Sequence, residues 1–313
     1  MGRFTLLLYP LGQPAVSIGE GILRVVFEKE RYTPYASLSA VFYMDTLPRD
    51  IYAIRLNDGA ATVFHGSAEF CEIKKTPRGI LARVRAVSYS AGLVRNEPKP
   101  DLHYGVNLAG LLSNNISIPY VIPEADTITA NYIYVKKNCS LWDAVTALCM
   151  KTYGDFPYLL DYRNLRFTVP AGAQSYTTAF SELLDYGFGS DLSRVISFAH
   201  MQDVDGNTDT FNTANTYAQA RQIVRHKEFD FDIQWAANPQ TALNQRINDS
   251  MRAVKYRTLR YPGYRGEDLR ERITVTGGDF SVTNMEISRL RVELTPRGIT
   301  TQLWCYQDAF CNQ

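Results

Sequence analysis

One pentapeptide occurs twice in this chain, as Thr76-Pro77-Arg78-Gly79-Ile80 and again as Thr295-Pro296-Arg297-Gly298-Ile299. Each copy lies between two runs that have the length and composition of β-strands. Proline at the second position and glycine at the fourth favour a type I turn. We therefore expect the same hairpin near the end of two β-rich units. A match this short can arise by chance, but its matching context indicates an internal duplication.

The first of these units, residues 1–96, is predicted to be almost entirely β. Strand-like runs alternate with Gly, Pro, Asp and Asn, and Asn57-Asp58-Gly59 is a tight-turn signal. A short helix is expected at Ser90–Arg95. Many short strands joined by turns are typical of a small barrel or sandwich. The expected strands are Phe4–Tyr9, Ile22–Glu28, Ala40–Tyr43, Ile51–Leu56, Ala61–Lys74 and Ile80–Tyr89.

Residues 97–170 are predicted to form a middle α+β domain, entered through Pro98 and Pro100. Ser140 is a good helix N-cap, and Asp143 follows near the positive end of that helix. Gly154 is expected to end the helix. The other expected elements are a short helix at Val106–Leu112, a strand at Thr127–Val135, and a hairpin of Tyr158–Tyr162 with Leu165–Val169, which Pro170 ends.

Residues 171–313 are predicted to form a second β-barrel with one long helix. Asn238 and Pro239 are typical of a helix start. An apolar stripe of Leu243, Ile247, Met251 and Val254 extends this helix, which we place at Ala242–Arg257. The polar segment Asp203–Thr216 is predicted to be an exposed loop. The expected strands are Val195–His200, Gln222–Ile233, Arg272–Thr276, Met285–Leu294 and Ile299–Tyr306. The predicted fold is therefore mainly β, with two similar small β-barrels and an α+β insertion.

The composition excludes several classes of protein. The chain has 313 residues, of which 33 are basic and 32 acidic, and its net charge is +1. It therefore lacks the overall basic excess that is typical of a nucleic-acid binder. None of the cysteines form a CxxC pair, and the histidines are scattered, so we expect reduced, mostly buried thiols, no metal site and no cofactor. These residues are Cys71, Cys139, Cys149, Cys305 and Cys311, with His65, His103, His200 and His226.

The N-terminal apolar run, Phe4–Tyr9, is too short for a signal peptide and is followed by Pro10. No run approaches the 18 apolar residues of a membrane-spanning helix. We therefore expect cytoplasmic synthesis and no membrane insertion.

Taken in order, several motifs resemble the baseplate hub family of contractile phage tails and tailocins, the late control D or tail-hub group. The first is Asn57-Asp58-Gly59 with Val63-Phe64-His65-Gly66, then a long strand pair that ends in Val84–Pro98. The second is the helix start Asn138–Val145, followed by Phe156-Pro157-Tyr158. The third is the C-terminal block through Pro262-Gly263 to the closing hairpin. The resemblance covers most of the chain, although the Asp203–Thr216 loop has no counterpart in it.

This resemblance implies a structural protein rather than an enzyme. Family hubs are homotrimers in which each chain contributes two tail-tube-like β-barrels, so that the ring has pseudo-sixfold symmetry. The implied partners are the hexameric tail tube protein and a trimeric central spike on a separate chain, with baseplate wedge and tape-measure proteins as further candidates. The implied location is the baseplate of a virion or tail particle. The hairpin residues Thr76, Pro77, Arg78, Gly79, Thr295, Pro296, Arg297 and Gly298 are the candidate interface.

A second candidate surface is the most basic stretch of the chain. The most specific functional hypothesis for this stretch is transient contact with DNA in the tube lumen. Glu267, Asp268 and Glu271 dilute its charge, so a solvated helix face with inter-subunit ion pairs is favoured instead. The stretch comprises Arg252, Lys255, Arg257, Arg260, Arg265, Arg270 and Arg272, with Tyr256, Tyr261 and Tyr264 among them.

Other chemistry is weakly supported. Asp203, Asp205, Asn207 and Asp209 resemble a calcium loop, but Gly206 comes too early and no closing Glu follows. No nucleophile elbow or glycine-rich phosphate loop is present. Three alternatives to the hub remain: a distal-tail or tail-associated adaptor of a non-contractile tail, a tail-associated cell-wall hydrolase, and an unrelated β-rich binding protein.

Overall fold

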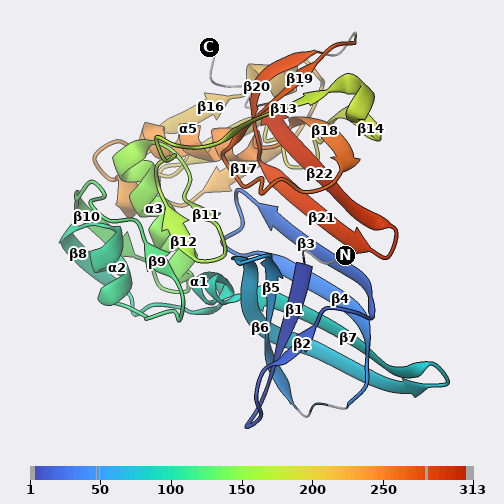
Figure 1. The fold of residues 1–313 in the computed structure, drawn as a ribbon. Helices are drawn as coiled ribbons and strands as arrows, with labels where there is room; N and C mark the ends of the chain where they lie inside the picture. Colours follow the sequence, from blue (N-terminus) through green and yellow to red (C-terminus); the bar gives the residue numbers. More distant parts are fainter. Residues whose placement is uncertain (1–3, 47, 49, 279–280, 308–313) are drawn as a thin grey trace. The chain divides into compact units, whose positions relative to one another are not determined.

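The computed structural model describes residues 4–46, 48, 50–278 and 281–307. The chain folds into two compact units, the first of Met1–Asp185 with Leu259–Trp304 and the second of Tyr186–Thr258 with Cys305–Gln313. Most of the regular structure is strand (Figure 1), so the prediction of a mainly β fold is confirmed.

A curled sheet dominates the first unit, and its strands follow the order β22-β21-β3-β4-β7-β6-β5-β1-β2 (Figure 1). Alternate side chains are buried along β1, β4 and β21, so one face of the sheet packs on the core. The strands expected in residues 1–96 are all present. The bounds are β1 Phe4–Pro10, β2 Val16–Ile18, β3 Ile22–Glu30, β4 Ser37–Met44, β5 Ile51–Asp58, β6 Ala61–Thr76, β7 Gly79–Ser88, β21 Arg289–Thr295 and β22 Gly298–Gln307.

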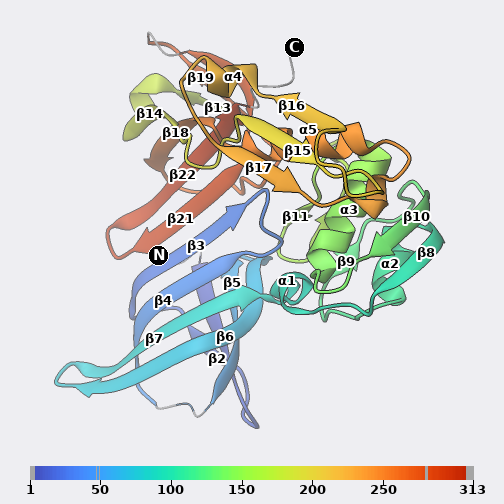
Figure 2. The ribbon, with the colours of Figure 1, turned by 180° about the vertical axis from the view of Figure 1, so that it is seen from behind.

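The long strand β6 changes its neighbours at Glu69. The β6–β7 register shifts between Ala68 and Phe70, so Glu69 is the extra residue of a bulge. Before the bulge, β6 pairs with both β5 and β7. After it, within the described residues, only β7 pairs with β6. In Figure 2 the resulting β6–β7 hairpin projects beyond the rest of its sheet.

Gly66, in the Val63-Phe64-His65-Gly66 motif, lets β6 and β7 approach closely. A Cβ at Gly66 would lie 2.0 Å from the carbonyl oxygen of Val87, so no side chain fits there.

The two Thr-Pro-Arg-Gly segments form hairpins with the same register, as predicted. Thr76 is opposite Gly79, and Thr295 is opposite Gly298. In each turn the threonine Oγ1 accepts a hydrogen bond from the arginine N–H and donates one to the glycine carbonyl, at 3.2 and 2.8 Å in the first copy and 3.3 and 3.2 Å in the second. The glycines have φ of +118° and +136°, a conformation that L side chains rarely adopt.

The order of hydrogen-bonded neighbours is also duplicated. In one set β3 lies beside β4, β4 beside β7, and β7 beside β6; in the other, β14 (Asp185–Ser190) lies beside β18 (Lys255–Pro262), β18 beside β22, and β22 beside β21. Each set ends in a Thr-Pro-Arg-Gly hairpin. Pairing of β21 with β3 places the hairpin of the second set in the same sheet as the first set.

The middle segment of the first unit packs two small sheets against a helix. Helix α3 (Leu141–Tyr153) begins with the predicted capping box of Ser140 and Asp143 and ends at Gly154, whose φ is +67°. Its buried face packs on β10 and β12. The predicted hairpin is present. The bounds are η1 Tyr89–Ala91, α1 Gly92–Arg95, β8 Asp101–Val106, α2 Leu108–Ser113, β9 Ile122–Pro123, β10 Ala130–Val135, β11 Tyr158–Leu160 and β12 Asn164–Arg166.

The remaining elements of the first unit are β13 (Ser175–Ala179), η2 (Phe180–Glu182), β19 (Arg272–Thr276) and β20 (Val282–Glu286), and β13, β19 and β20 form a three-stranded sheet. In the second unit, β15 (Phe198–Met201) pairs with β16 (Phe211–Ala214) and β17 (His226–Phe229), and helix α5 (Pro239–Ser250) packs on this sheet. The shorter helices of this unit are α4 Thr216–Gln219 and η3 Ile233–Trp235.

Four predicted segments are wrong in extent. The long helix ends at Ser250 rather than Arg257, because Ala253 has a φ of +57° and Lys255 begins β18. Met285–Leu294 is two strands, because the chain changes its partner strand between them. The Ile287 N–H donates to the backbone carbonyl of Glu271, whereas the Ser288 N–H donates to the backbone carbonyl of Trp304. Gln222–Ile233 is strand only over β17, since Gln222 has a positive φ and Asp232 caps η3. The Asp203–Thr216 loop contains β16.

Replacing Gly298 with alanine should destabilise the first unit by about 1–3 kcal/mol, because the strain of its φ persists although a Cβ would meet no atom within 4 Å. Gly79→Ala should behave alike. The measurement is the urea midpoint followed by circular dichroism. Gly172→Ala is the matched control, since Gly172 also has open space but no positive φ. Equal midpoints for Gly298→Ala and the control would contradict the prediction.

Candidate assembly surfaces

The tips of both hairpins are exposed, as a contact surface requires. Pro77, Arg78 and Gly79 are exposed, and so are Pro296, Arg297 and Gly298. The threonine that starts each turn is half-buried because its hydroxyl closes the turn. Each turn is therefore closed by its own threonine, and each presents one arginine to solvent. Their role as an interface stays a prediction.

The basic stretch is not a helix face, because Lys255, Arg257 and Arg260 lie on strand β18. Several of its members have partners in their own chain. Arg252 pairs with Asp249 at 2.5 Å, and Arg265 pairs with Glu182 at 3.6 Å and donates to the carbonyl of Thr177 at 2.9 Å. Arg257 donates to the hydroxyl of Tyr186 at 2.5 Å. The charges of Arg252 and Arg265 are therefore partly neutralised by acids of the same chain, which leaves less positive charge to attract a nucleic acid. Contact with DNA or another subunit stays a prediction.

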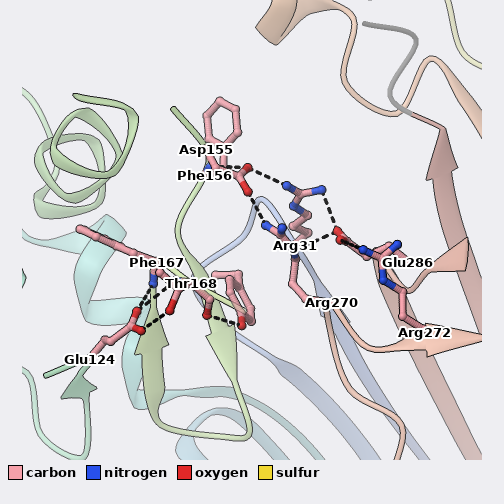
Figure 3. Close-up of polar contacts among 10 residues, drawn as sticks. Arg31, Glu124, Asp155, Phe156, Phe167, Thr168, Arg270, Arg272 and Glu286 are labelled. Atoms are coloured by element: carbon pink, nitrogen blue, oxygen red, sulfur yellow. Dashed lines mark hydrogen bonds and ion pairs between the residues drawn. The ribbon is translucent and has the colours of Figure 1, made fainter. Parts of the chain in front are cut away.

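Arg270, from the same stretch, belongs to a buried cluster that joins distant segments of the first unit (Figure 3). Asp155, after helix α3, accepts from Arg31 and from Arg270 at 2.7 Å each. Glu286, at the end of β20, pairs with the same two arginines at 2.9 Å each. The four side chains therefore form a closed ring of alternating charge, and Arg272 lies 3.8 Å from Glu286 at its rim.

Burial makes this ring sensitive to the loss of any member. The side chains of Arg31 and Arg270 are only 7% and 11% exposed, so an arginine left without its acid would be a desolvated charge. Burial opposes the ionisation of Asp155, but the charges of Arg31 and Arg270 outweigh it and hold the pKa of Asp155 below its ordinary value. Asp155 is therefore charged at neutral pH.

A second buried ion pair lies in the same unit. Lys29, on β3, pairs with Asp268 and donates to the carbonyl of Asp161 at 2.7 Å. The other Asp268 oxygen accepts from the Asp161 N–H at 2.6 Å. Burial nevertheless raises the pKa of Asp268, because its full desolvation outweighs the attraction of Lys29. Lys29 and Asp268 thus tie the β11–β12 turn to β3.

Glu124 performs a similar task within the middle segment (Figure 3). Its Oε2 accepts from the N–H groups of Phe167 and Thr168 at 2.6 and 3.1 Å, while Oε1 bonds the Thr168 hydroxyl and lies 3.3 Å from Arg166. The end of β12 is therefore held by one carboxylate.

Sequence reasoning missed these three clusters. Partners in the arginine ring are 16 to 255 positions apart, so no local spacing marks them. The one local signal is a charged Lys29–Arg31 segment at the end of an apolar strand.

Among the histidines of the described chain, His65 has the most strongly shifted pKa, and its neighbours are aromatic rings that pack against it. Burial and the nearby charge of Arg55 lower the pKa of His65 to about 4, so it is neutral at pH 7. Its ring contacts the rings of Tyr89 and Tyr120, with centroids 5.2 and 4.8 Å apart. These contacts anchor β6 to η1.

The Asp203 loop is organised by its own side chains. The Asp203 carboxylate accepts from the N–H groups of Asp205 and Asn207 at 2.9 Å each, and from the Thr210 hydroxyl at 2.8 Å. Hydrogen bonds, with those from Asn207 the strongest, lower the pKa of Asp203 to about 2. Its oxygens therefore already have donors.

The described residues contain no cluster of three His, Cys, Asp or Glu side chains that could hold a metal ion. Of the described cysteines, Cys149 and Cys305 are buried, Cys139 is half-buried and Cys71 is exposed. Cys311 lies outside the described residues. Across the described residues, no helix combines the length and apolar character needed to cross a membrane.

Comparison with solved structures places the fold among tail proteins. A tail protein from Neisseria meningitidis MC58 superposes with a TM-score of 0.72 at 14% identity, covering 97% of both chains. The 43 kDa tail protein of prophage MuSo2 from Shewanella oneidensis gives 0.68 at 11% identity, covering 98% of this chain and 97% of that one.

A third structure is c3393 of Escherichia coli, a component of the type VI secretion system described as similar to T4 bacteriophage tail proteins gp27 and gp5. Its TM-score is 0.54 at 9% identity, covering 96% of this chain and 77% of that one. No protein-family model and no curated protein matches the sequence. At these identities the likeness establishes a shared fold.

Replacing Asp155 with asparagine should lower the free energy of unfolding by about 1–3 kcal/mol at pH 7, less than for a fully buried pair because Asp155 is one-third exposed. The pKa of Asp155 is depressed in the folded state, so its contribution is present above the unfolded pKa of about 3.9 and is lost as the pH falls through the folded value. Urea unfolding of both proteins between pH 3 and 7 measures this.

The matched control is Asp45→Asn, at an exposed aspartate. A wild-type advantage over Asp155→Asn that stayed constant down to pH 3 would show that the carboxylate charge is not responsible.

Proposed function

We propose that this chain is a structural hub of a phage-type tail or a related contractile injection machine. Three copies form a ring of pseudo-sixfold symmetry, which joins the hexameric tail tube to a trimeric central spike. The ring sits in the baseplate of a virion or tail particle, where it nucleates the tube and allows the payload to pass.

The observation that carries this proposal is the duplicated strand order. One chain has two sets of four neighbouring strands, each ending in a Thr-Pro-Arg-Gly hairpin of identical register. Three chains closed by a threefold axis would present six similar hairpins. A duplicated chain is the simplest way to match a trimeric partner to a hexameric one. The likeness to solved tail proteins supports the same assignment.

The proposed ring implies the following partners. One face of the ring meets the tail tube protein, and the exposed hairpins Thr76–Gly79 and Thr295–Gly298 are its candidate contacts. The other face meets the spike protein, with wedge and tape-measure proteins as further neighbours. The basic residues of β18 are candidates for inter-subunit ion pairs or for the lumen that DNA traverses.

We further propose that the chain has no catalytic activity. The charged clusters of the first unit connect its segments, and the acids in them accept hydrogen bonds from backbone or arginine groups. Peptidoglycan turnover by the purified chain would contradict this and favour a tail-associated hydrolase.

The purified chain should have a mass three times that of the 35.4 kDa monomer in light scattering. Negative-stain averages should show a ring with near-sixfold appearance. A stable hexamer would instead favour a distal-tail adaptor of a non-contractile tail. A monomer that stays monomeric with the tube and spike proteins present would overturn the hub proposal.

A further inference from the structure

We propose that neighbouring copies of this chain join by strand pairing, between Phe70–Lys75 of β6 in one copy and β14 of the next. The inference rests on the proposed ring and names the edges that close it. The chain itself contains a template for this contact. The strands that correspond to these two edges in the internal duplication, β21 and β3, already pair with each other within one copy.

The template is the pairing of β21 with β3. Superposing the two Thr-Pro-Arg-Gly hairpins places β6 residue n on β21 residue n + 219, so Phe70–Lys75 corresponds to Arg289–Leu294. On β21 this segment pairs along its whole length with β3, antiparallel, with Val292 opposite Phe27. On β6 the same segment follows the Glu69 bulge, and within the described chain its outer edge has no strand beside it.

The equivalent of β3 is β14. Met44 of β4 lies opposite Ile80, and Gly263, directly after β18, donates its N–H to Ile299. Both shifts equal 219 (263 − 44 and 299 − 80), so β18 corresponds to β4. The strand paired with β4 is β3, and the strand beside β18 is β14.

The register along β14 follows from three contacts. Asp191 N–H donates to Val254 at 2.9 Å, a Cβ on Gly189 would meet the Tyr256 ring, and one on Gly187 would meet Thr258. Since Thr258 corresponds to Ser39, which is opposite Val26, Gly187 corresponds to Val26. Phe188 therefore corresponds to Phe27, and Ser190 corresponds to Lys29.

Transferring the β21–β3 register to the two free edges predicts the contact residue by residue. Ile73 lies opposite Phe188 of the second copy, as Val292 lies opposite Phe27 within the chain. Cys71 lies opposite Ser190 of that copy. Lys74 is opposite Gly187, which puts Asp185 of the second copy on the diagonal, within reach of an ion pair.

Exposure in the single chain fits this pairing. Phe27 is 1% exposed, whereas its equivalent Phe188 is 78% exposed. Val292 is buried, while Ile73 is only half-buried, and Cys71 is exposed where Leu290 is buried. Phe188, Ile73 and Cys71 are thus all less covered than their duplicates. An unpaired strand edge is a ready template for another chain.

The native thiol of Cys71 allows a direct test. In the variant Ser190→Cys, mild oxidation should join Cys71 of one copy to the thiol introduced at position 190 of the next. Opposite residues of antiparallel strands have Cα atoms about 4.5–5.5 Å apart, inside the range that a disulfide spans. Covalent ladders of dimer and trimer should appear on non-reducing gels. Mass spectrometry of the linked peptides identifies the bond.

Two controls separate this contact from random collision. Ser190→Cys combined with Cys71→Ser should give no ladder, and neither should Thr208→Cys, which places a thiol on an exposed loop. A ladder of equal yield from either control would overturn the pairing.

A second variant tests the energetics without oxidation. Phe188→Asp should raise the concentration at which the oligomer dissociates by about 100-fold, the effect of losing an interface hot spot. Because Phe188 is largely exposed in the single chain, the fold should be unaffected. Val224→Asp, at another highly exposed apolar residue of the second unit, should leave the assembly intact.

The two hypotheses fail differently. A trimer by light scattering without the engineered disulfide from Cys71 would retain the ring and reject this pairing. The disulfide in a hexamer or an open filament would retain the pairing and reject the trimeric hub. A monomer with no disulfide would reject both.

Discussion

The first unit depends on one long-range constraint, the pairing of β3 with β21. Residues 25–30 bond to residues 289–294, so strands near opposite ends of the chain are neighbours in one sheet. This pair joins the N-terminal strands to the closing hairpin, and it gives the two four-strand sets their common order. At the join of the two strands, Phe27 and Val292 are each 1% exposed. Burial of such side chains is the main source of stability in a fold of this kind.

Two buried ionic clusters connect the sheet to the middle segment of the first unit. The ring of Arg31, Asp155, Arg270 and Glu286 and the pair of Lys29 and Asp268 both start from the end of β3 and reach the middle segment. Ion pairs of this kind add little net stability compared with apolar packing. An arrangement that separates their members is strongly destabilised, because it leaves a buried charge without its partner. They therefore specify how the α+β segment is placed on the sheet inside the first unit.

The sequence predicts those parts of the fold that local chemistry determines. Both hairpins, the strands of residues 1–96, and the capping box of Ser140 with Asp143 follow from turn, alternation and capping rules. The end of the long helix does not, because the apolar spacing of Met251 and Val254 continues past Ser250 and only the backbone at Ala253 breaks it. The helix face expected for the basic stretch is wrong for the same reason. The acids that pair with Arg270 are more than ten residues away along the chain, so only the folded chain identifies them.

The β3–β21 pair also determines when the protein can finish folding. A ribosome adds roughly 5–20 residues per second, so the edge of β3 waits on the order of ten to fifty seconds for β21 to be made. During that time the nascent chain exposes an unpaired apolar strand, the kind of surface that chaperones recognise and that aggregates when crowded. The first unit therefore cannot complete its sheet until most of the chain has been made, because β3 and β21 are about 260 residues apart in the sequence.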